Sequence, residues 1–228
     1  MSLFAIADTH LSFGTNKPMD TFEGWQNYTE KLRKNWNNVV SKNDYVVLAG
    51  DISWAINFDE LVPDFAFIDS LNGNKIILKG NHDYWWNTVK KMNEFLVDNN
   101  FSTIQFLYNN AVDFKDFSVC GSRGWMFDTD EEQDEKLLNR EVIRLEMSLK
   151  SAKCDEKIVF LHYPPVTTTD RCEEIFDLLL KYGIKKCYYG HLHGVAAKYA
   201  VDENVNSVEL KLISADRLEF VPYLIKKF

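Results

Sequence analysis

Five short apolar runs, each stopped by a polar or glycine-containing turn, constrain the fold of this chain more than any other feature. The runs cover residues 3–7, 45–49, 75–79, 158–161 and 187–189. Each run is rich in β-forming residues and apolar along most of its length, which is typical of a strand buried on both faces of its sheet. The sequence therefore predicts a fold in which these strands lie inside the molecule.

Helical patterns alternate with these runs, at residues 23–40, 58–71, 86–97, 131–152 and 170–182. The acidic residues at 128–132 suit a helix start, where negative charge meets the helix dipole, and we interpret them as a solvated edge. Further strand-like runs at 102–108, 117–121, 208–213 and 218–224 have no long helix between them, so we expect hairpin or meander strands in a second sheet. Together the patterns predict an α/β fold of mixed sheets flanked by helices, in a single domain over residues 1–228.

Charge and cysteine content limit the classes of function. The formal net charge is −8, which disfavours binding to long nucleic acid, because such binding needs a basic face. A small phosphorylated substrate remains compatible, since a bound metal can reverse the local field. The four cysteines are widely spaced and are expected to be reduced thiols. With no basic start before Asp8 and no apolar run of membrane-spanning length, we expect a soluble, cytoplasmic protein.

All five histidines of the chain follow directly after the apolar runs. The motifs there are Asp8-x-His10, Gly50-Asp51, Gly80-Asn81-His82-Asp83, His162 and Gly190-His191-x-His193. Because ligand sites in α/β sheets form at the carboxyl ends of strands, we expect these side chains to meet at one rim. The glycines at 50, 80 and 190 would permit sharp turns or close approach of the backbone.

The mixture of carboxylate, imidazole and amide oxygen in these motifs suits Mn²⁺, Fe²⁺/³⁺ or Zn²⁺. The candidate ligands exceed what one ion needs, and they permit two ions bridged by Asp51. The predicted ligands are Asp8, His10, Asp51, Asn81, His162, His191 and His193.

The order DxH, GD, GNHD, H and GHxH resembles the calcineurin-like metallophosphoesterase superfamily, over residues 8–193. The resemblance implies a four-layer αββα sandwich of two mixed β-sheets. It also implies one metal held by Asp8, His10 and His193, and a second held by Asn81, His162 and His191, with Asp51 as the bridge. A metal-bound hydroxide would then attack phosphorus. The adjacent His82 would act as a catalytic residue that stabilises the transition state or protonates the leaving oxygen.

The chain departs from one pattern in the superfamily. Protein Ser/Thr phosphatases carry GDxxDRG, whereas here Gly50-Asp51 is followed by Ile-Ser-Trp-Ala, so that Trp54 replaces the carboxylate and the arginine is absent. A protein phosphatase is therefore disfavoured. The departure leaves open which group orients His82, and Asp83 is adjacent to it only in sequence.

Residues near the motifs are candidates for substrate contact. Arg123, flanked by Gly121-Ser122 and Gly124, could clamp phosphate oxygens or anchor a loop, and Asn81 is also expected to contact substrate. The aromatic residues Trp54, Tyr84, Trp85 and Trp86 could stack on a substrate ring, but we favour packing between sheet and helix.

The sequence as a whole predicts a dinuclear metal-dependent phosphoesterase, with manganese, iron or zinc, acting on a small phosphodiester or phosphomonoester. A nuclease on short oligonucleotides and a non-catalytic metal-binding scaffold are the alternatives. We expect no membrane partner, and the sequence does not predict the oligomeric state.

Overall fold

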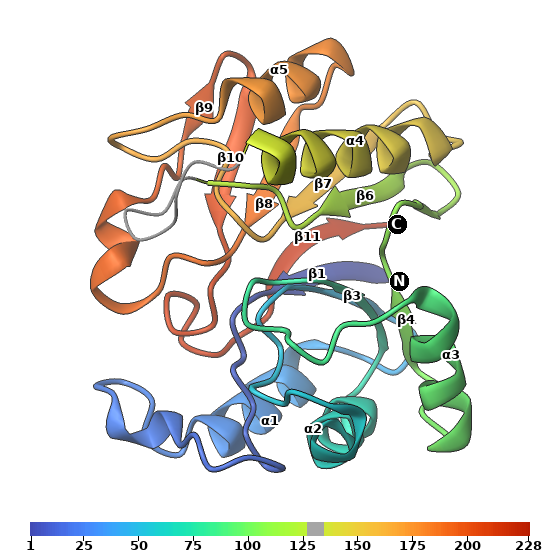
Figure 1. Cartoon of the computed structure of the whole chain (residues 1–228), viewed down its shortest axis with the longest axis vertical. Helices are drawn as coiled ribbons and strands as arrows, with labels where there is room; N and C mark the ends of the chain where they lie inside the picture. The colour runs from blue at the N-terminus through green and yellow to red at the C-terminus, as the bar shows by residue number, and fades with distance from the viewer. Residues whose placement is uncertain (127–134) are drawn as a thin grey trace.

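The computed structural model describes residues 1–126 and 135–228 and arranges them in four layers, with helices outside and two β-sheets inside (Figure 1). This arrangement confirms the predicted αββα sandwich of mixed sheets.

The first sheet has the strand order β11-β1-β2-β3-β4. Strands β1 to β4 are parallel to one another, and β11 pairs antiparallel with β1 at the edge. The bounds are β1 Ser2–Ile6, β2 Tyr45–Ala49, β3 Asn74–Leu78, β4 Ile104–Phe106 and β11 Tyr223–Lys227.

The second sheet has the order β5-β6-β7-β8-β10-β9. Its four central strands are parallel, and the short strands β5 and β9 pair antiparallel at its two edges. The bounds are β5 Val112–Asp113, β6 Ser118–Ser122, β7 Lys157–Leu161, β8 Lys186–Tyr189, β9 Asn204–Val205 and β10 Val208–Leu212.

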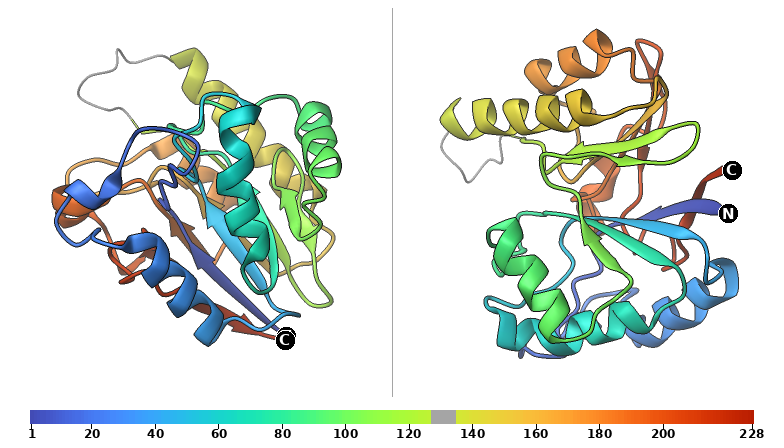
Figure 2. Two further views of the ribbon diagram at one scale, coloured as in Figure 1. Left: turned by 90° about the horizontal axis from the view of Figure 1, so that it is seen from below. Right: turned by 90° about the vertical axis from the view of Figure 1, so that its right-hand side faces the viewer.

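Helices cover the outer face of each sheet, as the side view shows most clearly (Figure 2). The first sheet carries α1 Tyr28–Val39, α2 Phe58–Ser70 and α3 Val89–Asp98, and the second carries α4 Glu135–Ser151 and α5 Glu173–Lys181. Two short 3₁₀ helices, η1 Met19–Thr21 and η2 Gly194–Tyr199, lie in loops. Among the residues that the structure describes, no helix is both long enough and apolar enough to cross a membrane.

The apolar runs are buried on both faces because each strand contributes to two cores. Along β1, Leu3 and Ala5 pack between the two sheets, whereas Phe4 and Ile6 pack against the helices below. Alternate residues of a strand point to opposite faces, so a strand between two apolar layers must be apolar throughout. The unbroken apolar runs in the sequence are thus the signature of the inner layers.

The predicted hairpin or meander arrangement of the later strands is wrong in part. β4, within the run at 102–108, belongs to the first sheet and lies parallel to β3, because α3 forms the crossover between them. β6 and β10 do lie in the second sheet, but each is parallel to its central neighbour. The run at 218–224 begins as a turn, with Glu219 and Phe220 at positive φ, and β11 starts only at Tyr223.

The predicted helices are present; α1, α3 and α5 begin a few residues later than predicted, whereas α2 begins at Phe58 as predicted. α1 begins at Tyr28 rather than at residue 23, because Gly24 and Asn27 adopt left-handed backbone conformations that no α-helix continues. α3 begins after Thr88, whose hydroxyl accepts a hydrogen bond from the backbone N–H of Lys91. The predicted acidic helix start at 128–132 lies outside the described residues.

Candidate metal centre

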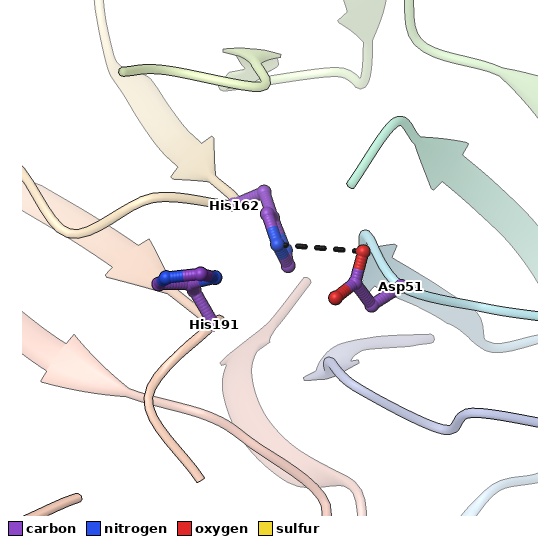
Figure 3. Close-up of side chains that lie close together, drawn as sticks. All are labelled: Asp51, His162 and His191. Carbon is purple, nitrogen blue, oxygen red and sulfur yellow. Dashed lines mark ion pairs between the residues drawn. The ribbon is translucent and has the colours of Figure 1, made fainter. Parts of the chain in front are cut away.

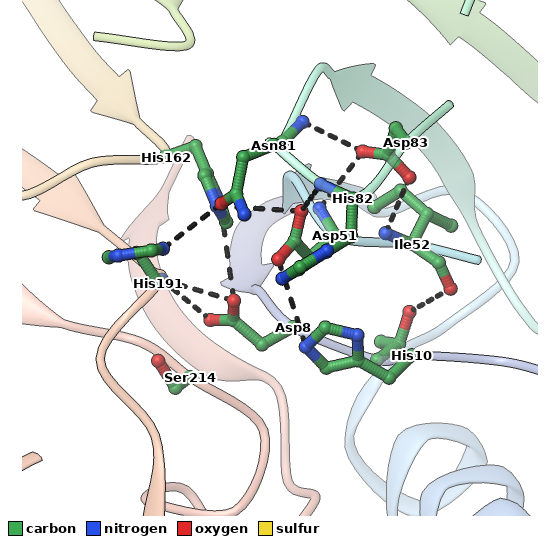
Figure 4. A network of polar contacts seen from close by, with 12 residues as sticks. Asp8, His10, Asp51, Ile52, Asn81, His82, Asp83, His162, His191 and Ser214 are labelled. Atoms are coloured by element: carbon green, nitrogen blue, oxygen red, sulfur yellow. Dashed lines mark hydrogen bonds and ion pairs between the residues drawn. The ribbon is translucent and has the colours of Figure 1, made fainter. Parts of the chain in front are cut away.

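Five loops bring the predicted ligands together at the carboxyl ends of strands from both sheets. Loops after β1, β2 and β3 carry Asp8 and His10, Asp51, and Asn81, whereas loops after β7 and β8 carry the other histidines. The edges meet because the backbone N–H of Ala7 donates to the carbonyl of Ile213 at 2.8 Å. The site therefore lies between the sheets, and each sheet supplies part of it (Figure 4).

The backbone at these positions is unusual. Asp8, His10, Asp51 and His191 all have positive φ, between 43° and 70°. Left-handed backbone is unfavourable for residues other than glycine, and it collects at functional sites where the surrounding structure enforces it. Each of these turns follows a strand directly and aims a polar side chain into the space between the sheets.

The glycines before the ligands are required by close approach, as the sequence predicted. A Cβ atom on Gly80 would lie 2.1 Å from Asp51 Oδ1, and a Cβ on Gly190 would lie 2.7 Å from Asp8 Oδ2. Neither separation is compatible with van der Waals contact. The glycines thus allow the ligand loops of different strands to touch.

One group of candidate ligands comprises Asp8, His10 and Asp51, whose donor atoms lie within 4.8 Å of one another. The His10 ring is 1% exposed and is stacked on Trp54 at 4.8 Å, yet neither of its nitrogens has a hydrogen-bond partner among the described residues. Buried polar atoms are nearly always bonded, so an imidazole in this environment is suited to bind a cation. His193 lies beside this group, with its ring 5.0 Å from that of His10.

A second group comprises Asp51, His162 and His191, again with donor atoms within 4.8 Å of one another (Figure 3). The Nδ1 atom of His162 lies 3.1 Å from the carbonyl oxygen of Ala49, which assigns the proton to Nδ1 and leaves the lone pair on Nε2. That lone pair faces Asp51 Oδ1 at 3.5 Å and Asn81 Oδ1 at 2.6 Å. Three acceptors that converge without a proton to share fit a bound cation.

Burial sets the protonation of these groups. It lowers the pKa of His162 to about 3 and that of His10 well below its usual range, so both imidazoles are neutral, which is the form that binds metals. Burial also raises the pKa of Asp51 to about 6, and burial followed by repulsion from Asp51 raises the pKa of Asp8. Two buried carboxylates held together in this way favour a cation between them.

Asp83 does not orient His82. Its carboxylate accepts hydrogen bonds from the backbone N–H groups of Asp51 at 2.9 Å, Ile52 at 2.9 Å and Gly80 at 2.7 Å, and from the indole of Trp85. Its side chain therefore connects the loop after β2 to the loop after β3 by hydrogen bonds. Adjacency in sequence hid this role, because the side chain points away from its neighbour.

Tyr84 and Trp54 contact the His82 ring. The hydroxyl of Tyr84 lies 3.3 Å from His82 Nδ1, and the Trp54 ring centroid lies 4.6 Å from that of His82. The backbone N–H of His82 donates to Asp51 Oδ1 at 2.8 Å, which ties this residue to the bridging candidate. The aromatic residue at position 54 thus stands where the protein phosphatases carry a carboxylate.

Two buried polar residues at or near the site escaped the sequence analysis. Ser214 follows the run at 208–213 directly, and its side chain is fully buried beside Asp8. Burial raises the pKa of Asp8, and a hydrogen bond from Ser214 offsets part of that rise. The rule that identified the predicted ligands, a polar residue at a strand end, also applies to Ser214. Glu141 on α4 carried no such signal, and it pairs with Arg123 at 3.5 Å.

The aromatic residues near the motifs divide as follows. Trp85 is buried and Trp86 packs on Phe106 at 5.4 Å, as expected for packing residues. Trp54 stacks on His10, and Tyr84 is 56% exposed beside His82. Only the latter pair borders the metal centre.

Comparisons with known proteins agree with this geometry. A family model described as calcineurin-like phosphoesterase matches residues 1–195. An uncharacterized protein of Methanocaldococcus jannaschii is 31% identical over 86 residues, which are 36% of this chain and 46% of that protein. The match thus spans about half the length of that relative.

Solved structures share the fold at low sequence identity. A protein of unknown function from Aquifex aeolicus has a TM-score of 0.54 and 16% identity, with 98% of this chain and 95% of that chain covered. A phosphopantetheinyl hydrolase from Mycobacterium tuberculosis has a TM-score of 0.59 and 12% identity, with coverage of 100% and 96%. At these identities the likeness is one of fold alone.

Proposed function

Because this chain belongs to the calcineurin-like phosphoesterase family, we propose that it hydrolyses a small phosphoester with the help of two divalent cations. The observation that carries this proposal is the pair of ligand groups that have Asp51 in common. A shared carboxylate is the expected bridge of a two-metal phosphoesterase site.

In this proposal Asp8, His10 and His193 hold one cation, Asn81, His162 and His191 hold the other, and Asp51 contacts both. The ions would be manganese, iron or zinc, since the donors are nitrogen and oxygen without thiolate. When bound, such ions supply a coordinated water of lowered pKa and positive charge for the phosphoryl oxygens.

The chain's own residues supply the remaining functions. Asp8 and Asp51 are aimed by the left-handed turns after β1 and β2, and the carbonyl of Ala49 fixes the ring of His162. His82 would donate a proton to the leaving oxygen or stabilise the charge that develops there, and Tyr84 holds its ring. Asn81 would contact the substrate phosphoryl group as well as a cation.

The proposed substrate is small. The formal net charge of −8 disfavours the binding of a polyanion such as long nucleic acid. A small ester can bind without a long positively charged groove. A phosphodiester and a phosphomonoester both fit the site. Cytoplasmic location stays a prediction from the sequence.

The first test compares bis(p-nitrophenyl) phosphate with p-nitrophenyl phosphate on protein stripped of metal and reloaded with Mn²⁺. Faster diester cleavage supports a phosphodiesterase, and activity that then rises on short oligonucleotides supports the nuclease alternative. Faster monoester cleavage supports a small-molecule phosphatase. Metal binding without turnover of either ester contradicts the proposal and supports a scaffold.

A further inference from the structure

A basic pocket adjoins the metal centre but contains none of the predicted metal ligands. It lies where β3, β4 and β6 end, and α4 closes its outer side. Its charged lining residues are Lys79, Arg123, Glu141 and Arg144. The enclosed part is about 10 Å³, which has room for one water at most, so a larger ligand would bind at its mouth.

The pocket has more positive than negative charge. Glu141 is 1% exposed; its Oε1 accepts a hydrogen bond from Arg144 at 2.5 Å and forms an ion pair with Arg123 at 3.5 Å. Lys79 is half-buried, and neither a hydrogen bond nor an ion pair reaches its ammonium group from the described residues. Three cations and one carboxylate leave two positive charges, which is the complement of a phosphate dianion.

One hydrogen-bond donor in the pocket lacks a partner, as a site for an anion requires. Arg123 Nε is buried without a hydrogen bond among the described residues. The acceptors Glu141 Oε2 and Asn109 Oδ1 also lack partners there, and they suit a water molecule rather than a phosphate oxygen. Arg123 itself is held in place, because its guanidinium lies 5.0 Å from the Trp125 ring. The pocket thus contains a fixed arginine and an unpaired lysine, two groups that bind phosphate well.

The pocket is covalently and structurally tied to the metal centre. Lys79 immediately precedes Gly80 and Asn81, and the carbonyl of Arg123 accepts the backbone N–H of His162 at 3.1 Å. A ligand at the mouth of the pocket would therefore lie beside the loops that carry Asn81 and His162.

We propose that Lys79, Arg123 and Arg144 bind a second phosphate group of the substrate, so that the preferred substrate is a phosphoester with another phosphate nearby. This inference rests on the proposed phosphoesterase function. Arg123 is thereby assigned to the distal phosphate rather than to the reacting one, because its guanidinium is paired with Glu141.

The test uses matched substrates that differ only in the second phosphate. Propyl phosphate and propane-1,3-diol bisphosphate form the pair for monoester cleavage, and their p-nitrophenyl esters form the pair for diester cleavage. We expect kcat/KM to be at least tenfold higher for the bisphosphorylated member, because charge-assisted hydrogen bonds are formed to it. Equal kcat/KM values would overturn the inference and leave the proposed function intact, whereas no turnover of any ester would overturn the function itself.

Variants show whether the pocket causes the preference. Lys79→Gln removes a charge that bonds to no described residue, so the fold should persist, and we expect the preference to fall about tenfold. Arg144→Gln should act in the same direction. Lys90→Gln is the control, because Lys90 is 85% exposed on α3 and should leave the preference unchanged. An unchanged preference in Lys79→Gln would contradict the assignment.

Binding to metal-free protein gives a readout that needs no turnover. Calorimetric titration with propane-1,3-diol bisphosphate should give a Kd about tenfold weaker in Lys79→Gln than in the Lys90→Gln control. Identical Kd values in the two variants would show that the pocket does not bind the phosphate.

Discussion

Asp51 is the residue that both ligand groups share, and its replacement separates a two-metal site from a one-metal site. Asp51→Asn keeps an oxygen for the N–H of His82 but loses the bridging charge, so we expect both metals to be lost. Metal analysis after gel filtration would measure ions per chain. Asp8→Asn is the matched control, which should lose one ion more readily than the other. Retention of one full equivalent in Asp51→Asn would contradict the shared ligand.

His82 is predicted to act on the substrate without binding metal. His82→Ala should therefore keep its metal content and lower kcat about 100-fold, as expected when a general acid is removed. Tyr84→Phe removes only the contact to His82 Nδ1 and should lower kcat several-fold with KM unchanged. Loss of metal from His82→Ala would show that this histidine is a ligand. A change in KM alone in Tyr84→Phe would argue against a positioning role.

At the residue scale, the sequence predicted which polar side chains lie close together, whereas their roles stay predictions. Asp8, Asp51 and His162 each follow an apolar run, so their meeting at one rim could be anticipated from strand polarity. The contact between Tyr84 and His82 could not, because it depends on side-chain rotation rather than on spacing. The pairing of Glu141 with Arg123 joins a helix to a loop and has no local pattern at all.

At the scale of elements, the loop after β3 depends on the absence of a side chain at residue 80. A Cβ there would lie 2.2 Å from the backbone nitrogen of Asp51, so Gly80→Ala should displace one ligand loop and reduce bound metal. Gly183→Ala is the control, because its φ of +65° is unfavourable but no atom lies within 4 Å. It should lower stability by about 1 kcal/mol and keep both metals. Equal metal content in the two variants would contradict the close approach.

The packing of α4 against α5 includes an ion pair with a testable pH dependence. Glu146 accepts from Lys181 at 2.8 Å, pairs with Lys150 at 3.1 Å and accepts from the hydroxyl of Tyr182 at 3.0 Å, and these contacts lower the pKa of Glu146 to about 2. A lowered carboxyl pKa stabilises the fold above the unfolded value of 4.5, and this stability is lost as pH falls toward 2. Urea unfolding of wild type and Glu146→Gln should differ at pH 7 and converge near pH 2. A difference that grows at low pH would contradict the pairing.

The sequence predicted the type of most helices and strands, but it predicted their bounds and their neighbours less well. The inner strands were clear because burial on both faces makes them apolar throughout. The sheet that receives β4 was not clear, because a local β pattern does not reveal its neighbour, and the α3 crossover decides it. The start of α1 depended on the left-handed turn at Asn27, which helical periodicity does not report.

For the whole molecule, the metal centre lies between two sheets that also meet through an apolar core and through backbone hydrogen bonds at Ala7. Asp8, Asp51 and Asn81 come from the first sheet and His162, His191 and His193 from the second, so cations held by both would oppose their separation. Ligands that bind only the folded state raise its stability by mass action, by about 4 kcal/mol at a thousandfold excess over Kd. We therefore expect Mn²⁺ to raise the Tm of metal-free protein by about 10 °C.

Scanning calorimetry with and without Mn²⁺ measures this shift, and Asp51→Asn provides the control that should not respond. If added Mn²⁺ left the Tm of the wild-type protein unchanged, a metal site shared between the sheets would be contradicted.

The left-handed backbone at Asp8, His10, Asp51 and His191 has a practical consequence for protein engineering. Glycine tolerates this conformation without strain, so replacing Asp8 or Asp51 would remove about 1 kcal/mol of steric cost together with a buried carboxylate. A screen that rewards thermal robustness of the metal-free chain would therefore enrich glycine at these two positions. The selected variants would be more stable without metal, but each such replacement would remove a side chain that is predicted to bind a cation.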